Sequence, residues 1–381
     1  MALSTYDYNR RRRKKRHNWT FEIITAFIVA LTICCAYAGA IGPQTFFGAP
    51  FMVLAFIPML ILSLVFLVIA LFARRWIAAL VVVFGFVATA PIIKMFVPMN
   101  TIDTAPPMPA DPKLVLKVMT YNALSFNYNE SGLNAKPSES MRLILDNNPD
   151  VVLLQEGGAV GVEWNEIPSI KPYMDEIKQK FPYCYQSGEG LNIMSKYPFT
   201  TQAVGESQHS RTLLGYNRNQ SSHVARVYDL QLPSGKQLRL VDFRLQSYHL
   251  SFGKNMDVRV SPDVKPSAIE RMRRSFVLRS DNASVVRQAV DESPANVIVC
   301  GDMNDVTTSH VYRVIKGEDL TDAWADVGRG YAHTFNRHHL PFRIDHVLYR
   351  GDVRAVAATR LKGGSSDHYP LMVSFDIDIT K

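Results

Sequence analysis

Acidic residues are almost absent from the first hundred positions of this chain. Residues 1–100 contain ten Lys or Arg but only Asp7 and Glu22, a net charge of +8. The whole 381-residue chain also has a formal charge of +8, so residues 101–381 are neutral. The later part therefore lacks the overall basic charge typical of nucleic-acid-binding domains, although this count leaves room for a local basic patch.

Cysteine is scarce as well, with four in the chain. Cys34 and Cys35 lie in an apolar segment, and Cys184 and Cys300 lie in predicted strands. No spacing typical of cysteine metal sites is present, which argues against a structural zinc site. The four residues are interpreted as small apolar side chains. A Cys184–Cys300 disulfide is left open, because a sequence does not test its geometry.

Three apolar stretches follow one another: Trp19–Ile41, Phe51–Phe72 and Trp76–Pro98. Each is about as long as a membrane-spanning helix. A signal peptide would have one short apolar core and a cleavage site. Three stretches in a hundred residues also argue against buried helices of a soluble protein. Pro91 and Lys94 weaken the third stretch, and Pro91 is expected either to kink its helix or to end it early.

The distribution of basic residues predicts the topology. Arg10–Arg16 is an unbroken run of seven basic residues, for which a nuclear-localisation or nucleic-acid-binding arm is the first alternative. The apolar stretches that follow favour a cytoplasmic flank instead, and the Arg74-Arg75 pair belongs on the same side. The uncharged loop Gly42–Pro50 suits the far side. Three crossings place the later part of the chain outside the cytoplasm; without the third crossing it would be cytoplasmic.

Four regions are predicted from these features. Residues 1–18 form a basic cytoplasmic N-terminus and residues 19–98 a three-helix membrane anchor in contact with the lipid bilayer. Residues 99–113 form a tether, because Thr101–Pro112 is rich in proline and such chain is stiff and extended. Residues 114–381 form a globular domain, which the tether holds near the membrane surface.

Short strands alternate with helices in the globular domain. The strands are predicted at 116–121, 151–154, 183–186, 191–194, 224–232, 237–243, 297–300, 345–349, 355–361 and 371–377. The helices are predicted at 138–147, 167–181, 266–290 and 308–315. Pro233-Ser234-Gly235 predicts a hairpin. The pattern predicts a two-sheet, four-layer α/β sandwich, preceded by three transmembrane α-helices.

The segment VIVCGDMND, residues 297–305, organises this domain. Its apolar start predicts a short buried strand, and Gly301 is expected to let the backbone turn. Asp302 and Asn304 are two residues apart, so in an extended chain they project to the same side. Strand ends are where α/β folds place their chemistry. A carboxylate beside a carboxamide can orient an attacking water and accept its proton, although Asp302 also suits a turn cap.

Five further polar motifs occur along the chain: Thr120-Tyr121-Asn122, Leu153-Leu154-Gln155-Glu156, Asn192–Pro198, Arg343-Ile344-Asp345-His346 and Ser366-Asp367-His368-Tyr369-Pro370. In this order, together with VIVCGDMND, the set resembles the endonuclease/exonuclease/phosphatase superfamily over Leu114–Ile377. This group includes pancreatic deoxyribonuclease, abasic-site endonucleases, inositol polyphosphate 5-phosphatases and neutral sphingomyelinases. The resemblance implies the sandwich fold and a metal-dependent phosphoric ester hydrolase.

The resemblance also implies a role for each polar residue. The cofactor is expected to be Mg²⁺, with Mn²⁺ also suitable, because hard cations prefer oxygen ligands. The implied metal shell is Asn122, Glu156 and Asp367. The implied catalytic residues are Asp302, which activates water, Asn304, which positions the water or the phosphate, His368, which contacts the scissile phosphate, and Asp345, which orients His368.

Simpler interpretations of three of these residues stay open. Glu156 also suits a helix cap or a salt bridge, and His368 also suits a lone surface histidine. Arg343 is either a phosphate clamp or part of a structural ion pair.

Arg244 departs from the family pattern. Family members commonly have a histidine at the end of the central hairpin strand, and in Asp242-Phe243-Arg244-Leu245 an arginine takes that position. Arginine does not donate its proton at ordinary pH, but it can hold a phosphoryl oxygen in a bidentate manner. His249 would face the opposite side if the strand continued. Either the leaving group needs little acid assistance, or the activity is reduced or absent.

These features predict a membrane-anchored, Mg²⁺-dependent phosphoesterase that acts outside the cytoplasm on a phosphodiester or phosphomonoester. The substrate is either a nucleic acid or a phospholipid head group. The tether favours lipid, and the neutral charge of the domain gives nucleic acid no support. The alternative is a catalytically weak or inactive module that binds phosphate or metal on the same fold.

Overall fold

A computed structural model describes residues 18–100, 113–127, 136–158, 161–206, 223–233, 235–247, 268–336 and 342–378. The basic run Arg10–Arg16, the tether segment Thr101–Pro112 and His249 lie outside these ranges. Contacts divide the chain into two compact units. One unit consists of residues 1–37 and 54–90, and the other of residues 38–53 and 91–381. The second unit contains the predicted globular domain.

Three long apolar helices begin the described chain: α2 (Thr20–Tyr37), α3 (Ala49–Phe72) and α4 (Trp76–Phe96). All three are long and apolar enough to cross a membrane. Pro58 lies inside α3 and Pro91 inside α4, yet both helices continue, and α4 reaches Phe96. Pro91 therefore does not end the third helix early. In the first unit, Thr32 and Ser63 share a buried hydrogen bond of 2.9 Å, which satisfies two hydroxyl groups in apolar surroundings.

The second unit contains two six-stranded sheets. The first has the order β11-β12-β1-β2-β4-β3, and its strands are β1 (Lys113–Asn122), β2 (Val151–Gln155), β3 (Tyr183–Tyr185), β4 (Asn192–Ser195), β11 (Val353–Arg360) and β12 (Leu371–Asp378). The second has the order β5-β6-β7-β8-β10-β9, and its strands are β5 (Phe199–Glu206), β6 (His223–Gln231), β7 (Gln237–Arg244), β8 (Val297–Asp302), β9 (Thr321–Asp322) and β10 (Asp345–Arg350). Both sheets are mixed: β1 and β2 are parallel, as are β7 and β8.

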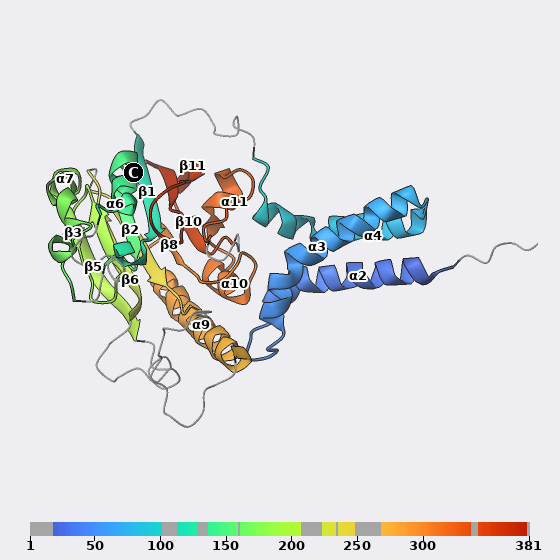
Figure 1. The fold of residues 1–381 in the computed structure, drawn as a ribbon. Coiled ribbons are helices and arrows are strands. Elements are labelled where there is room, and N and C mark those ends of the chain that lie inside the picture. Colours follow the sequence, from blue (N-terminus) through green and yellow to red (C-terminus); the bar gives the residue numbers. More distant parts are fainter. Residues whose placement is uncertain are drawn as a thin grey trace, which may run out of the picture. The chain divides into compact units, whose positions relative to one another are not determined.

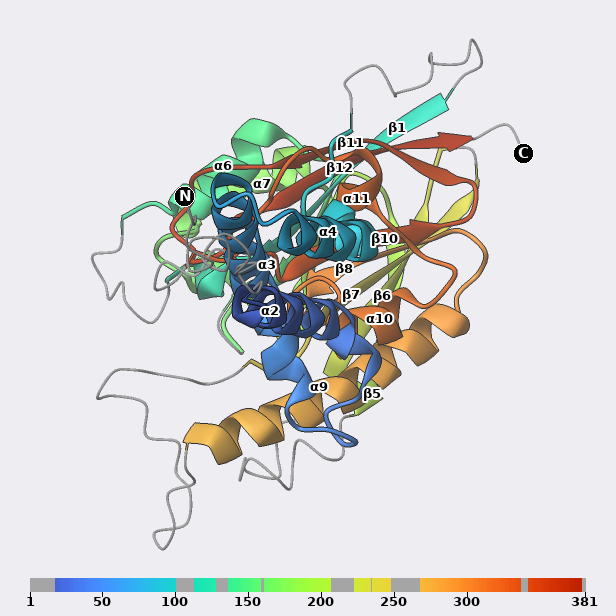
Figure 2. The same ribbon diagram turned by 90° about the vertical axis from the view of Figure 1, so that its right-hand side faces the viewer.

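The sheets pack face to face, and helices cover their outer faces (Figures 1 and 2). One apolar cluster fills the space between the sheets. A second lies between the first sheet and helices α6 (Glu139–Asn147) and α7 (Met174–Lys180). A third lies between the second sheet and helices α9 (Ala268–Asp291) and α10 (His310–Lys316). These four layers confirm the predicted α/β sandwich.

The alternation of side chains along the strands explains where the polar residues point. In β8, Ile298 and Cys300 face the other sheet, whereas Val297 and Val299 face the helices. Both faces are buried, which is why this strand is an unbroken apolar run. Asp302 continues the inward-facing series. The same count places five more polar residues on the inner side of strand ends: Asn122, Gln155, Asp242, Arg244 and Asp345.

Some predicted elements differ from the observed ones. The helix predicted at 167–181 is confirmed only over the seven-residue α7, Met174–Lys180; it is preceded by a short 3₁₀ turn, Lys171–Tyr173. Pro168 and Pro172 are the physical reason, because proline removes helix hydrogen bonds and restricts the preceding residue. Strands β5 and β9 and the helix α11 (Ala323–Val327) were not predicted. The thiols of Cys184 and Cys300 are both free, so they form no disulfide.

Gly301 does not turn the chain, because it lies inside β8 opposite Phe243 of β7. A Cβ atom at this position would lie 2.1 Å from the Phe243 carbonyl oxygen. We therefore expect Gly301→Ala to lower the free energy of unfolding by more than about 2 kcal/mol, since the strands would have to separate. Chemical denaturation of the detergent-solubilised protein measures this change.

Gly188→Ala is the matched control for this prediction. No atom lies within 4 Å of a Cβ built at Gly188. This variant should change the unfolding free energy by less than about 0.5 kcal/mol. Equal stability of the two variants would contradict the role assigned to the close approach at Gly301.

Candidate active site

Asn122 joins carboxylates from the two sheets. It ends β1, and its Nδ2 donates to Glu156 Oε1 at 3.1 Å and to Asp302 Oδ2 at 3.0 Å. Its Oδ1 accepts from the backbone N–H of Leu124 at 3.2 Å, which fixes the orientation of the amide. Glu156 follows β2 of the first sheet, and Asp302 ends β8 of the second. The residues predicted from distant motifs therefore meet at one end of the sandwich.

Glu156 reaches this site through an unusual backbone conformation. Strand alternation would direct a residue at this position towards the helices, as it does Leu154. Glu156 instead has a φ of 46°, in the left-handed region that non-glycine residues seldom adopt. Its carbonyl oxygen accepts a 2.8 Å hydrogen bond from Ser125 N–H. The turn brings its carboxylate to the inner side, where it contacts Asn122 and Arg244.

Arg244 forms an ion pair with the predicted metal ligand. Its Nη2 lies 2.6 Å from Glu156 Oε1, and both side chains are partly exposed. Its Nε is buried and has no hydrogen-bond partner in the described part of the chain. The guanidinium therefore neutralises Glu156 and keeps one donor available for a further acceptor.

Asp302 is buried and accepts hydrogen bonds from two asparagines. The backbone N–H of Asn304 donates to its Oδ1 at 2.8 Å, and the Asn304 side chain donates to its Oδ2 at 3.0 Å. The pKa of Asp302 is raised to about 6, because burial, with a smaller contribution from Asp345, outweighs His368 and Arg244, which lower it. Asp302 is thus mostly ionised at neutral pH and basic enough to accept a proton from water.

His368 is held by Asp345 and faces Asp302. Its Nδ1 lies 2.9 Å from Asp345 Oδ2, and its Nε2 lies 4.0 Å from Asp302 Oδ2. Burial by itself lowers the pKa of the imidazole, but Asp345 and Asp302 outweigh it and raise the pKa to about 9. At neutral pH the ring is therefore a cation, with Nε2–H directed at the interior of the site. The interpretation of His368 as a lone surface histidine is therefore excluded.

The site has the donor set of a divalent-cation site. Ligand atoms of Asp302, Asp345 and His368 lie within 4.8 Å of one another. Asp345 Oδ1 is buried and lacks a hydrogen-bond partner within the described ranges. Glu156 and Asp367 lie outside this group; Asp367 is half-buried, and its charge contributes to the raised pKa of His368. Among the described residues of the site, four carboxylates, those of Glu156, Asp302, Asp345 and Asp367, face only two cations, Arg244 and His368. This excess of negative charge and of oxygen ligands fits a hard metal ion.

Several supporting residues were not predicted from the sequence. Gln155 Nε2 donates to Asp242 Oδ1 at 2.5 Å and so links the two sheets behind the site. Asp242 is fully buried, and burial raises its pKa well above the usual range. Arg279 of α9 donates to the backbone carbonyl of Asn304. The alternation of side chains along β2 and β7 could have identified Gln155 and Asp242 as inward-facing residues. Nothing in the local sequence indicates that Arg279 contacts the site.

Arg343 is a structural residue and not part of the site. Its Nη2 lies 3.0 Å from Asp322 Oδ2, and both side chains are almost completely buried. The phosphate clamp that the sequence left open for Arg343 is therefore wrong.

We expect Asp345→Asn to lower the pKa of His368 by at least about one pH unit, since the variant removes the adjacent negative charge. An NMR titration of the imidazole, assigned by comparison with His368→Gln, measures this. Asp229→Asn is the control, because Asp229 of β6 pairs with Arg239 of β7 and not with His368. An unchanged His368 titration in Asp345→Asn would contradict the pairing.

One known protein family matches most of the globular domain. The family model described as "Endonuclease/Exonuclease/phosphatase family" matches residues 119–368. No curated protein matches the chain significantly. The catalytic domain of human Nocturnin with bound sulfate has 17% identity and a TM-score of 0.44, over 69% of this chain and 96% of that one.

Two further solved structures are similar. D. rerio TDP2 complexed with single-strand DNA product has 17% identity and a TM-score of 0.44, over 70% and 99% of the two chains. Sphingomyelinase C from Streptomyces griseocarneus has 17% identity and a TM-score of 0.41, over 70% and 100%. The family model covers more than half of the sequence, and the chain belongs to the endonuclease/exonuclease/phosphatase family.

Proposed function

We propose that this protein is a membrane-anchored, Mg²⁺-dependent phosphoesterase whose active site lies outside the cytoplasm. The observation that carries the proposal is the contact of Asn122 with both Glu156 and Asp302, beside the His368–Asp345 pair. Glu156 and Asp367, with Asn122 nearby, would hold the metal ion. When bound, the ion would neutralise a phosphate group and polarise its phosphorus–oxygen bonds.

The protein side chains divide the remaining tasks. Asp302 accepts the proton of the attacking water, and the Asn304 amide keeps this carboxylate in one orientation. The His368 imidazolium donates from Nε2 to a phosphoryl oxygen and stabilises the negative charge that develops there. Asp345 holds the ring through Nδ1. This division requires the carboxylate and the imidazolium to coexist near pH 7. A pKa of about 6 for Asp302 and of about 9 for His368 allows this.

Arg244 takes the place of the family histidine as a second phosphate donor. Its side chain is partly exposed, which favours contact of the guanidinium with a phosphoryl oxygen once substrate is present. Because arginine keeps its proton, it would stabilise charge and would not protonate the leaving group. The reaction then favours substrates whose leaving oxygen needs little acid assistance.

The second candidate function is a binding module with little catalysis. The Arg244–Glu156 ion pair is the observation that favours it, because a guanidinium at 2.6 Å competes with a metal ion for this carboxylate. Calorimetric titration with Mg²⁺ and single-turnover assays separate the two functions. Mg²⁺ binding without cleavage of any phosphoester would favour the module.

The extracytoplasmic location has support from residues 38–53. This segment joins α2 to α3, and it belongs to the same compact unit as the sandwich. A loop and a domain that pack together lie on one side of a membrane. Since α3 leads away from that side, α4 has to return to it, as three crossings require. The positive-inside rule then favours a cytoplasmic N-terminus and Arg74-Arg75 pair.

Phospholipid is the substrate class that we favour over nucleic acid. The net charge of residues 101–381 is zero, so the domain lacks a general attraction for polyanions. Attachment to a membrane raises the effective concentration of lipid head groups near the site. Raising the salt concentration in the assay distinguishes the two classes, because cleavage of DNA should fall steeply with salt and cleavage of lipid should not.

Glu156→Ala should reduce hydrolysis of a panel of phosphodiesters and phosphomonoesters by at least about 100-fold, because it removes the predicted metal carboxylate. Initial rates in Mg²⁺ measure the effect. Glu166→Ala is the control, since Glu166 is an exposed residue on a neighbouring turn. Equal rates in Glu156→Ala and the unmodified protein would refute the proposed chemistry.

Labelling of intact cells tests the location. In a chain whose four cysteines are replaced by alanine, Gly188→Cys should react with a membrane-impermeant maleimide in intact cells. Arg74→Cys, in the turn between α3 and α4, should react only after lysis. The reverse pattern would place the sandwich in the cytoplasm.

A further inference from the structure

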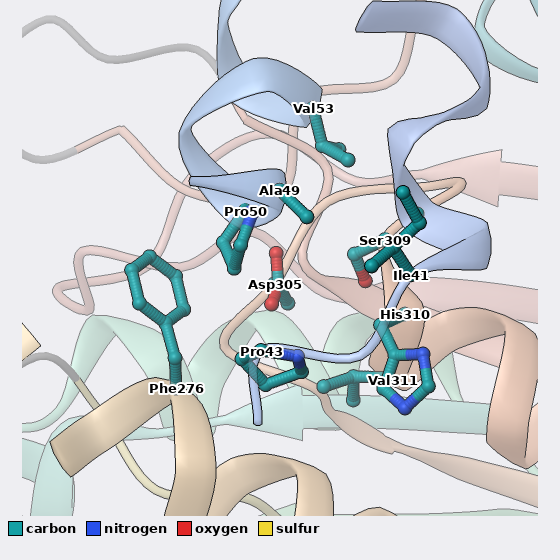
Figure 3. Close-up of a pocket in the computed structure, with 11 residues that line it drawn as sticks. Ile41, Pro43, Ala49, Pro50, Val53, Phe276, Asp305, Ser309, His310 and Val311 are labelled. Atoms are coloured by element: carbon teal, nitrogen blue, oxygen red, sulfur yellow. The ribbon is translucent and has the colours of Figure 1, made fainter. Parts of the chain in front are cut away.

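The segment between the first two apolar helices packs directly behind the catalytic loop. Gly39 lies so close to Thr308 that an added Cβ would be 1.8 Å from the Thr308 carbonyl oxygen. The His310 side chain hydrogen-bonds to the Gly39 backbone. Pro43 and Pro50 line a small hollow together with Asp305 (Figure 3). The loop that follows Asp302 and Asn304 is thus covered by residues of the anchor segment.

Aromatic rings continue this contact into α9. Phe47 and Phe51 place their rings 6.5 Å and 5.3 Å from that of Phe276, both edge to face. Phe276 is buried, and the guanidinium of Arg279, one turn further along α9, lies 5.5 Å from its ring centre. Phe276 therefore contacts both the rings of residues 38–53 and the guanidinium of Arg279.

Arg279 connects this aromatic contact to the catalytic residues. Its side chain is completely buried, and it donates to the carbonyl of Asn304 and, at 2.9 Å, to that of Gln246. Its Nη1 also lies 3.1 Å from Asp305 Oδ2. Asn304 in turn orients Asp302. One buried guanidinium thus ties together the chain that leaves β7 after Arg244 and the chain that leaves β8 after Asp302.

The end of the third apolar helix makes a similar contact on another strand end. The Met95 carbonyl of α4 accepts a 3.2 Å hydrogen bond from Arg343. The next residue, Ile344, accepts from Met303 N–H at 2.8 Å and precedes Asp345. Asn100 donates to the carbonyls of Ala325 and Gly328 at 3.2 and 2.9 Å. Residues 38–53 and the end of α4 therefore contact segments next to Asp302 and Asp345.

We propose that residues 38–53 are positioning residues of the active site: Phe51 and Phe47, through Phe276 and Arg279, hold Asn304 and Asp302 in the catalytic arrangement. This inference rests on the proposed function, because it assigns the loop a role in that reaction. Displacements well below 1 Å are sufficient to lower a rate when a base and its water have to be aligned. Residues 38–53, which join the first two apolar helices, would thus help to position the catalytic residues.

The test uses the full chain in lipid nanodiscs and bis-p-nitrophenyl phosphate as the substrate. We expect Phe51→Ala to lower kcat about tenfold and to change KM by less than about twofold, since substrate still binds while Asp302 loses its alignment. Phe51→Leu, which keeps an apolar side chain, should restore most of kcat. Phe66→Ala is the matched control: Phe66 lies on the same helix, and its ring stacks on Phe21 at 5.6 Å within the other compact unit.

Amide hydrogen exchange supplies a readout that does not depend on activity. In Phe51→Ala, peptides covering residues 302–310 should exchange faster, whereas peptides from β1 and β2 should be unchanged and thereby establish a folded sandwich. Unaltered exchange at residues 302–310 would overturn the inference, as would an unaltered kcat. If the unmodified chain hydrolyses nothing, the proposed function fails, and the exchange result alone decides whether the loop holds the catalytic segment.

Discussion

The constraint on which the site depends is the burial of carboxylates at one end of an apolar sandwich. An ionised carboxylate without a partner is costly to bury, so each one needs donors or cations close by. The structure provides amides for Asp302, an imidazolium for Asp345 and a guanidinium for Glu156. These groups lie at strand ends or in the segments that adjoin strands, and His368 stands shortly before β12. The architecture of the two sheets thus determines the chemistry that the site can perform.

Much of this arrangement could be predicted because strands alternate with a period of two. Asn122 and Asp302 end apolar strands and Asp345 begins one, so counting along each strand determines the direction of these side chains. Counting also places Arg244 on the inner side, but it does not identify Glu156 as its partner, because a long side chain can turn to any of several neighbours. Nor does it identify the partners of Arg279, which lie far away in the sequence. In the segment 167–181, apolar periodicity suggested a helix, and two prolines prevented most of it.

The anchor and the sandwich are less separate than the sequence suggests. Composition changes sharply near residue 100, which indicates a boundary between a membrane part and a globular part. Contacts follow a different division, in which residues 38–53 and 91–100 belong with the sandwich. Aromatic packing, close backbone approach and hydrogen bonds to main-chain carbonyls hold these segments against α9, α10 and α11. A change of composition therefore indicates whether a segment is apolar enough for a membrane. It does not indicate which compact unit the segment packs with.

Asp242 adds a property that concerns the folding of the chain. Its carboxyl group is enclosed between the sheets, and burial raises its pKa well above the usual range of aspartate. The unfolded chain would carry this group ionised, so folding takes up a proton at this position. The contribution of Asp242 to stability is accordingly greatest in acid, below the ordinary range of aspartate, and declines as the pH rises. If the domain is exposed to changes of external pH, this carboxyl group would contribute more to the free energy of unfolding in acidic than in alkaline media.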